Sequence, residues 1–338
     1  MFKNLILFRI GPDWNPGMAA LEAGLDKNRF VPCGPTQQKS LGWVEPRGEA
    51  GGALVESVGG HWLLKLLTEQ RVVPSSAVKQ RVDEIVAHIE QTTGRKPGKK
   101  EQKELKEQAL HELLPRAFTR QSATRVWIAP QQRLLVVDAG SQGKADEVTT
   151  LLVKEFEGLA LSLIQTAVSP AAAMTDWLGT GEAPAGFSIE RECELKTLDE
   201  MKSVVRYARH LLDTDEVRQH ILVGGKVPTR LAMTWQDRVS FMLTDTLQLK
   251  KLAFQDVVFE DKSPDDDGFD ADAAIATGEL IVLLPALFEV LGGEQEFGAA
   301  AAAPALAPLH PHVASGVPAA ASAAVAGSAA AETPPWED

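Results

Sequence analysis

The sequence has few of the residues around which disulfide-linked or metal-bound folds are built. Only two of its 338 residues are cysteines, Cys33 and Cys193, and they do not form a C-x-x-C pair. We therefore expect neither a disulfide framework nor a cysteine-bound zinc ion, and a reducing cytoplasm fits this composition. A single tyrosine and scattered tryptophans give no aromatic cluster of the kind that stacks single-stranded bases. Four tryptophans lie within apolar runs and are expected in the core: Trp43, Trp62, Trp127 and Trp235.

Long hydrophobic runs are also missing. The segment LIVLLPALFEVL is shorter than the roughly 20 residues of a membrane span and contains Pro285. The Gly-Lys pairs at 143–144 and 225–226 lack the upstream glycine and the following Ser or Thr of a phosphate-binding loop. We therefore expect neither a membrane protein nor an ATP-driven motor.

Two segments have part of a metal-binding motif. HELLP begins like the zinc-protease helix H-E-x-x-H, but Pro115 stands where the second histidine is needed. SPDDDGFDADAA has the Asp-Gly character of a calcium loop, but its twelfth position is Ala274 and not the bidentate acid. Neither segment predicts a metal site, and no cofactor is expected.

Acid-x-Lys triplets leave one catalytic alternative open. They occur at 194–196 and 200–202, and Asp176 lies upstream of both. Carboxylates that hold Mg²⁺ beside a lysine can cut DNA. A Mg²⁺-dependent DNA nuclease of recombination or repair is therefore the alternative to a protein that is not an enzyme.

The charge is unevenly distributed along the chain. The formal net charge is −12, but residues 256–338 contain 15 acidic residues and one lysine. Residues 94–125 contain nine Lys or Arg and four Glu. Local charge governs contact with a polyanion, so the acidic total does not exclude a nucleic-acid surface. The plain alternative for such a basic cluster is a solvated face.

Predicted strands and helices come in blocks and not in strict alternation, which favours an α+β fold with mixed or antiparallel sheets. Helices at 75–92 and about 99–114 are joined by the turn residues of GRKPGKK and form a projecting hairpin. We predict a central α+β domain of residues 1–74 with 116–169, the hairpin at 75–115, and a second α+β domain at 170–297. Residues 298–338 are Ala- and Pro-rich and are expected to be disordered.

Several segments, in the same order, resemble the RdgC family of recombination-associated proteins. They are FKNLILFRI, FVPCGP, LGWVEP, LLPRAFTR, FDADAAIATGEL and LGGE, and the resemblance covers about residues 1–296. The resemblance implies a curved, non-catalytic subunit of a ring-shaped homodimer. The positive hole of that ring would surround double-stranded DNA with little sequence preference, with single-stranded DNA as a further candidate, and would restrain RecA-dependent strand exchange. A cytoplasmic, nucleoid-associated protein is expected.

Exposed cations are the candidate DNA contacts because Lys and Arg bind phosphate oxygens without reading bases. The candidates are Arg95, Lys96, Lys99, Lys100, Lys103, Arg116, Arg120, Arg206 and Arg209. Phe118 stands between two of these arginines, three residues after Pro115. It is interpreted either as an ordinary core residue or as an aromatic at a subunit contact of the dimer.

Overall fold

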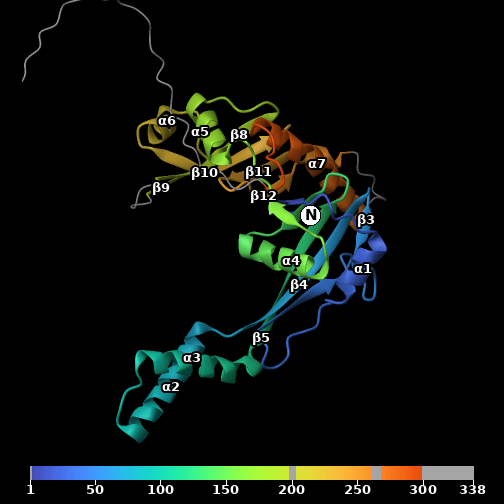
Figure 1. The fold of residues 1–338 in the computed structure, drawn as a ribbon. Coiled ribbons are helices and arrows are strands. Elements are labelled where there is room, and N and C mark those ends of the chain that lie inside the picture. The colour runs from blue at the N-terminus through green and yellow to red at the C-terminus, as the bar shows by residue number, and fades with distance from the viewer. Residues whose placement is uncertain (1, 198–202, 261–267, 299–338) are drawn as a thin grey trace, which may run out of the picture. The chain divides into compact units, whose positions relative to one another are not determined.

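The computed structural model describes residues 2–197, 203–260 and 268–298. Within them, twelve strands form one open sheet, and of the seven α-helices two, α2 and α3, project from the ends of strands β4 and β5 (Figure 1). The strand order is β2-β4-β5-β6-β1-β12-β11-β10-β8-β9, with β3 on β4 and β7 on β1. Neighbouring strands are antiparallel, and an isolated parallel bridge joins Arg29 to Trp43. The predicted α+β class is therefore confirmed, while the predicted division into domains stays a prediction.

The strands are β1 (Leu5–Ile10), β2 (Lys39–Val44), β3 (Glu56–Val58), β4 (His61–Val72), β5 (Phe118–Ala129), β6 (Leu134–Asp138), β7 (Leu161–Leu163), β8 (Phe187–Thr197), β9 (Val204–Ala208), β10 (Lys226–Trp235), β11 (Val239–Thr244) and β12 (Leu249–Phe254). The α-helices are α1 (Met18–Asp26), α2 (Ser75–Thr93), α3 (Lys99–Leu113), α4 (Gln142–Glu155), α5 (Pro170–Thr180), α6 (Asp215–Leu222) and α7 (Phe269–Val290). Short 3-10 turns lie at Leu114–Arg116 and Asp256–Phe259.

The two faces of the sheet are buried by different helices. In β1, Leu5 and Leu7 pack in one hydrophobic cluster with α5, α6 and α7, whereas Ile6 and Phe8 pack in the other with α1 and α4. This alternation follows from the two-residue period of a strand. We call the two sides the α7 face and the α4 face.

The C-terminal half of the sheet is covered on the α7 face. Cys193 of β8, Tyr207 of β9 and Leu231 of β10 all point into the cluster that contains α5, α6 and α7. Their neighbours along each strand point to the α4 face, and α1 and α4 pack on the other half of the sheet, against β1, β4, β5 and β6. The α4 side of β8, β9 and β10 therefore presents polar side chains without a covering helix among the described residues.

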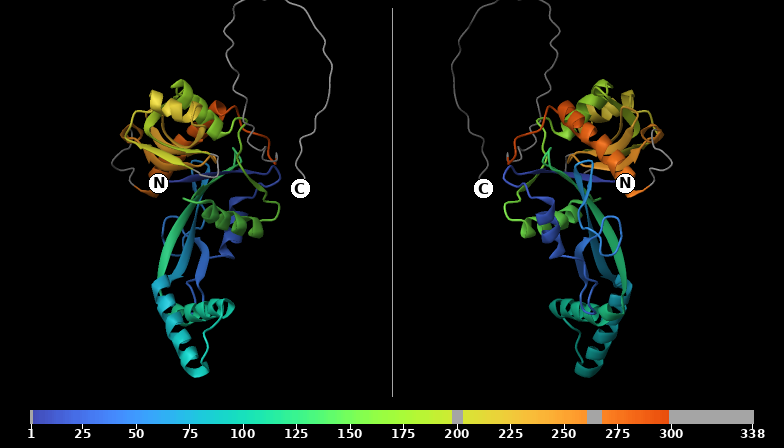
Figure 2. Two further views of the ribbon diagram at one scale, coloured as in Figure 1. Left: turned by 90° about the vertical axis from the view of Figure 1, so that its left-hand side faces the viewer. Right: turned by 90° about the vertical axis from the view of Figure 1, so that its right-hand side faces the viewer.

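The helical hairpin continues from the far ends of β4 and β5 (Figure 2). Leu105 and Ala109 of α3 are buried and four residues apart, as expected for one apolar face of a helix, and Val78 is the buried residue of α2. Gly94 ends α2 with φ of 71°, a left-handed conformation that favours glycine. Arg81 Nε donates to Glu112 Oε2 at 2.8 Å and joins the two helices near their other ends. The predicted hairpin is thus present, with α3 one residue shorter than expected.

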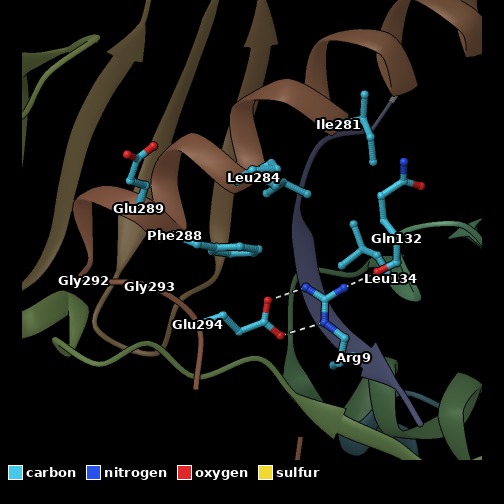
Figure 3. A pocket seen from close by; sticks show the side chains of 11 residues that line it. Arg9, Gln132, Leu134, Ile281, Leu284, Phe288, Glu289, Gly292, Gly293 and Glu294 are labelled. Carbon is cyan, nitrogen blue, oxygen red and sulfur yellow. Dashed lines mark hydrogen bonds and ion pairs between the residues drawn. The ribbon is translucent and has the colours of Figure 1, made fainter. Parts of the chain in front are cut away.

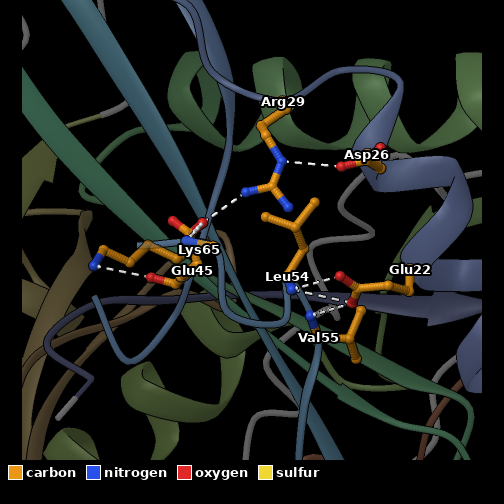
Figure 4. Close-up of polar contacts among 8 residues, drawn as sticks. Glu22, Asp26, Arg29, Glu45, Leu54, Val55 and Lys65 are labelled. Atoms are coloured by element: carbon orange, nitrogen blue, oxygen red, sulfur yellow. Dashed lines mark hydrogen bonds and ion pairs between the residues drawn. The ribbon is translucent and has the colours of Figure 1, made fainter. Parts of the chain in front are cut away.

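Polar contacts hold the loops around α1 (Figure 4). The Glu22 carboxylate accepts hydrogen bonds from the backbone N–H groups of Leu54 and Val55, each at 2.8 Å. Arg29, just after α1, forms ion pairs with Asp26 at 2.9 Å and with Glu45 at 2.6 Å. These contacts fix the segments on either side of β2.

A shallow apolar pocket lies between α7 and the central strands β1 and β6 (Figure 3). Leu284 and Phe288 of α7 and Leu134 of β6 form its apolar lining. At its edge Arg9 of β1 donates through Nε to Glu294 at 2.6 Å, and the second guanidinium nitrogen bonds the other carboxylate oxygen. This bidentate pair ties the segment after α7 to β1.

Three of the four tryptophans expected in the core are buried, with exposed fractions of 1%, 0% and 3% for Trp43, Trp127 and Trp235. Trp62 is half-buried and packs at the edge of the α4-face cluster. Helix α7 continues through Pro285, and its length and composition alone would also allow a membrane span. Eight of its residues are buried, as in the core helix of a globular domain.

Candidate nucleic-acid interface

The five candidate cations of the hairpin lie at the turn and on the first turns of α3. Arg95 contacts Glu101 at 3.3 Å and Lys96 contacts Glu90 at 3.6 Å, but their side chains remain 70% and 81% exposed. Exposed pairs of this kind contribute little to stability. Three further cations are exposed and form no ion pair with the described residues: Lys99, Lys100 and Lys103. The hairpin turn therefore presents a group of cations on long, exposed side chains.

The second group lies where the hairpin returns to the sheet. Arg116 is exposed in the 3-10 turn, and Arg120 is exposed in β5. Phe118 is 89% exposed and stands opposite Val72, which is 47% exposed, in the β4–β5 ladder. The interpretation of Phe118 as a core residue is therefore wrong for the single subunit. An exposed aromatic beside an exposed valine is a surface that a partner could cover.

Arg71 was missed by the sequence analysis and anchors the base of the hairpin. Its guanidinium donates to the carbonyl oxygens of Gly34, Leu114 and Ala117 at 3.1, 3.4 and 3.2 Å. One arginine thus satisfies carbonyl groups on both sides of the chain reversal that follows α3. Its position in a strand of alternating polarity gave no signal of this role, because the acceptors come from distant segments.

The third group lies on β8, β9 and β10. Cross-strand pairing places Arg206 opposite Glu194 and Glu194 opposite Arg230. Arg206 Nε donates to Glu194 Oε2 at 2.6 Å, and Arg230 Nη1 lies 3.9 Å from the same oxygen. Lys196 Nζ contacts Glu194 Oε1 at 2.9 Å. We call Arg206, Glu194 and Arg230 the arginine row. Arg209 lies just beyond β9, is exposed, and lines a separate hollow with Glu190 and Glu192.

Glu194 is the buried centre of this group, with only 5% of its side chain exposed. Burial by itself raises the pKa of Glu194, but hydrogen bonds from Lys196, Arg206 and Thr229 outweigh it and lower the pKa to about 2. The carboxylate is therefore ionised at neutral pH and holds the cations around it.

The residues of the nuclease alternative do not converge. Asp176 is on α5, which packs on the α7 face, whereas Glu194 points to the α4 face. Glu194 is also already hydrogen-bonded to Lys196 and Arg206. The triplet at 200–202 lies outside the described residues, as do residues 261–267 with most of the Asp-rich segment. Among described residues, no group of three His, Cys, Asp or Glu side chains is placed to hold a metal ion.

The three cationic groups are not one patch. The hairpin turn and Arg116 are separated by α3, whose 15 residues are about 22 Å long at 1.5 Å each. The arginine row is at the opposite end of the strand order, on β9 and its neighbours. Strand alternation nevertheless puts Arg120 and the arginine row on the same side of the sheet, the α4 face. A ligand that contacts all three groups must be long.

A family model described as "Putative exonuclease, RdgC" matches residues 1–294. The chain belongs to the RdgC family. Proteins named recombination-associated protein RdgC are similar over most of the chain. The relative from Dechloromonas aromatica (strain RCB) is 47% identical over 300 residues, 87% of this chain and 98% of its own length. The relative from Cupriavidus pinatubonensis (strain JMP 134) is 46% identical over 299 residues, 87% of this chain and 99% of its own.

The RdgC relative from Bordetella pertussis (strain Tohama I) is 43% identical over 298 residues, with the same coverage of 87% and 99%. The relatives' names support a role in recombination and name no enzyme, and the exonuclease description of the family model does not decide the question. The RdgC match ends at residue 294, so the Ala- and Pro-rich segment from 298 lies outside it. That segment, apart from Gly298, is also outside the described residues.

The low pKa of Glu194 predicts how the stability of this RdgC-family chain depends on pH. A carboxylate whose pKa is depressed by folding stabilises the fold above its unfolded pKa, near 4.5, and loses that contribution as pH falls toward about 2. Glu194→Gln should therefore lower the free energy of unfolding at pH 7, and the difference from wild type should shrink between pH 4.5 and about 2.

Chemical denaturation at several pH values measures this difference. Glu192→Gln is the matched control, since Glu192 is on the same strand and face but pairs with Lys251 at 2.6 Å on an exposed surface. Its effect should stay within about 1 kcal/mol, as for exposed pairs. A Glu194→Gln effect that is equally small at pH 7 would contradict the role given to the buried carboxylate.

Proposed function

We propose that the chain is a non-catalytic, sequence-tolerant double-stranded DNA-binding protein that works as a ring-shaped homodimer and restrains RecA-dependent recombination. The observation that carries the proposal is the set of exposed cations on the hairpin turn, its base and the α4 face. These side chains are suited to phosphate oxygens, and the chain has no helix-turn-helix or zinc-finger signature for reading bases. A protein that encloses duplex DNA would hinder RecA by occupying its substrate, and would be found on the nucleoid in the cytoplasm.

Two exposed apolar surfaces support a dimer with two contacts. One is Val72 and Phe118 at the hairpin base. The other includes Leu211, Leu222 and Val223, whose exposed fractions are 63%, 58% and 85%. These lie after β9 and at the end of α6, the other end of the strand order. Apolar surface at both ends of the sheet suits a subunit that meets its partner twice.

Exonuclease activity is the second candidate, and the description of the matched family model favours it. Linear and closed-circular plasmid incubated with the protein and Mg²⁺ separates the two functions. Binding with both plasmids intact supports the proposal. Shortening of the linear plasmid that EDTA abolishes would support the nuclease instead.

DNA binding should be steeply salt-dependent and nearly independent of sequence. Each phosphate that the protein neutralises releases condensed counterions, so the log–log slope should be about −0.9 for each contact on duplex DNA. Fluorescence anisotropy with several duplexes of equal length at increasing salt measures the slope. A flat slope, or strong preference for one sequence in competition, contradicts the proposal.

Charge reversal at the hairpin turn should weaken binding to every sequence alike. Lys99→Glu with Lys100→Glu removes two exposed cations that make no ion pair with the described residues. The matched control is Lys144→Glu with Lys154→Glu, which makes the same charge change on the exposed surface of α4. If both double variants bind equally well at low salt, the hairpin turn is not a DNA contact.

Phe118→Ser should leave the subunit folded and open one dimer contact. Because the ring is 89% exposed in the subunit, its loss removes no intramolecular core packing. We expect an unchanged circular dichroism spectrum, a smaller mass by light scattering at low concentration, and a larger loss of binding to closed-circular DNA than to short linear duplex. Val153→Ser, on an exposed valine of α4, is the control. Wild-type mass and circular-DNA binding in the folded Phe118→Ser variant would refute the interface.

A further inference from the structure

The arginine row lies across adjacent strands on an uncovered surface. Arg206 of β9, Glu194 of β8 and Arg230 of β10 are consecutive cross-strand neighbours, and Thr244 of β11 continues the line. The residues next to them along the strands, Tyr207, Cys193 and Leu231, are buried on the α7 face. The row therefore points to the α4 face by the alternation of the strands, and its direction is fixed by the core beneath it.

Burial differs sharply within the row. The Glu194 side chain is 5% exposed, whereas those of Arg206, Arg230 and Lys196 are 71%, 48% and 40% exposed. Thr229 Oγ1 donates to Glu194 Oε1 at 2.9 Å and helps to hold the carboxylate in place. The negative charge is thus at the bottom of the group and the positive charges are at its surface. A ligand that approaches from solvent meets the cations first.

Both arginines keep donor groups for a ligand. Of the guanidinium nitrogens of Arg206, only Nε is hydrogen-bonded to another described residue. The 3.9 Å contact of Arg230 with Glu194 is too long for a hydrogen bond. The planar guanidinium offers paired N–H groups that match two oxygens of a phosphate. Asp245, exposed after β11, is a further carboxylate that interacts with Lys196 and Arg230. The three cations still outnumber these two acids.

We propose that Arg206, Arg230 and Lys196, oriented by the buried Glu194, form a phosphodiester-binding site on the α4 face. This inference rests on the proposed DNA-binding function and adds a second anchor at the opposite end of the strand order from the hairpin. Lys196 and Arg230 gain a role that the sequence analysis did not give them. Glu194 is a positioning residue, because it touches the arginines and not the phosphate.

The test removes each charge without reversing it. Arg206→Gln and Arg230→Gln are compared with wild type in duplex binding across a salt series. Each lost phosphate contact should weaken binding about eightfold at 0.1 M salt and make the log–log slope shallower by about 0.9. Lys196→Gln should act in the same direction. Arg230→Lys keeps the charge and loses the fork, so it should recover part of the affinity.

The control is Arg218→Gln. Arg218 is on α6, on the other side of the sheet, and its guanidinium is paired with Asp213 and Asp215. Thermal melts of all variants check that each one is folded. If an arginine variant does not fold, Lys196→Gln still tests the site. Single-stranded DNA of equal length, measured in parallel, shows whether the site holds one strand or needs a duplex.

The outcomes separate the two proposals. If wild type binds no DNA, the proposed function fails and the site fails with it. If wild type binds, and the hairpin double variant binds weakly while the row variants keep wild-type affinity and slope, only the phosphodiester site is overturned. Equal losses in the row variants and in Arg218→Gln would also overturn it, since they would reflect total charge and not a site.

Discussion

In the C-terminal half of the sheet, each strand buries one row of side chains beneath α5, α6 and α7 and turns the next row away from these helices. This constraint decides which residues can meet a ligand. Cys193, Tyr207 and Leu231 have no freedom to leave the core, so Glu194, Arg206 and Arg230 have no freedom to enter it. A shift of one residue in the β8–β9 pairing would exchange the two rows. The polar face is thus a consequence of the apolar one.

The hairpin depends on a different kind of constraint. Its helices bury few residues, and only Val78 of α2 and Leu105 and Ala109 of α3 are fully covered within them. Isolated helices of this length are marginal in water, so the hairpin depends on the packing of α2 against α3 and on its attachment at Arg71, and the exposed pair of Arg81 with Glu112 adds little. The Glu112 carboxylate accepts hydrogen bonds from Arg81 and Gln108, which lower its pKa, so its contacts lie within the hairpin. Glu112, the acid of the His-Glu pair that begins HELLP, therefore has a structural role in the hairpin.

The sequence allowed much of the fold to be predicted where one local signal was strong. The 4, 3, 4 spacing of Val78, Val82, Ile85 and Ile89 predicted α2, and Gly94, Pro97 and Gly98 predicted the turn. Strands β2, β3 and β7 were missed, because LGWVEP contains turn-forming residues and the other two are three residues long.

The candidate site could be predicted only in part, since charge can be counted along a sequence but pairing cannot. Glu194 and Lys196 were noticed as a possible nuclease triplet, and Arg206 as a possible DNA contact. Their meeting around one carboxylate depends on the register of three strands, two of them separated by α6. Arg230 carried no signal at all, because a single arginine in an apolar strand is ordinary. Phe118 was ambiguous for a similar reason, as its exposure is set by how far β4 and β5 extend beyond the covering helices.

An acidic chain can present a cationic surface when its acids and bases are sorted between faces. The described part of the acid-rich C-terminal region includes α7, whose Glu279 pairs with Arg238 and whose Asp270 pairs with Arg47. This helix packs on the α7 face, opposite the arginine row. Because both acids are paired with arginines and charge is screened within about 8 Å at physiological salt, they contribute little at the arginine row. Net charge therefore reports little about where a cationic surface can form, because the strand register and the packing of the helices decide which charges share a face.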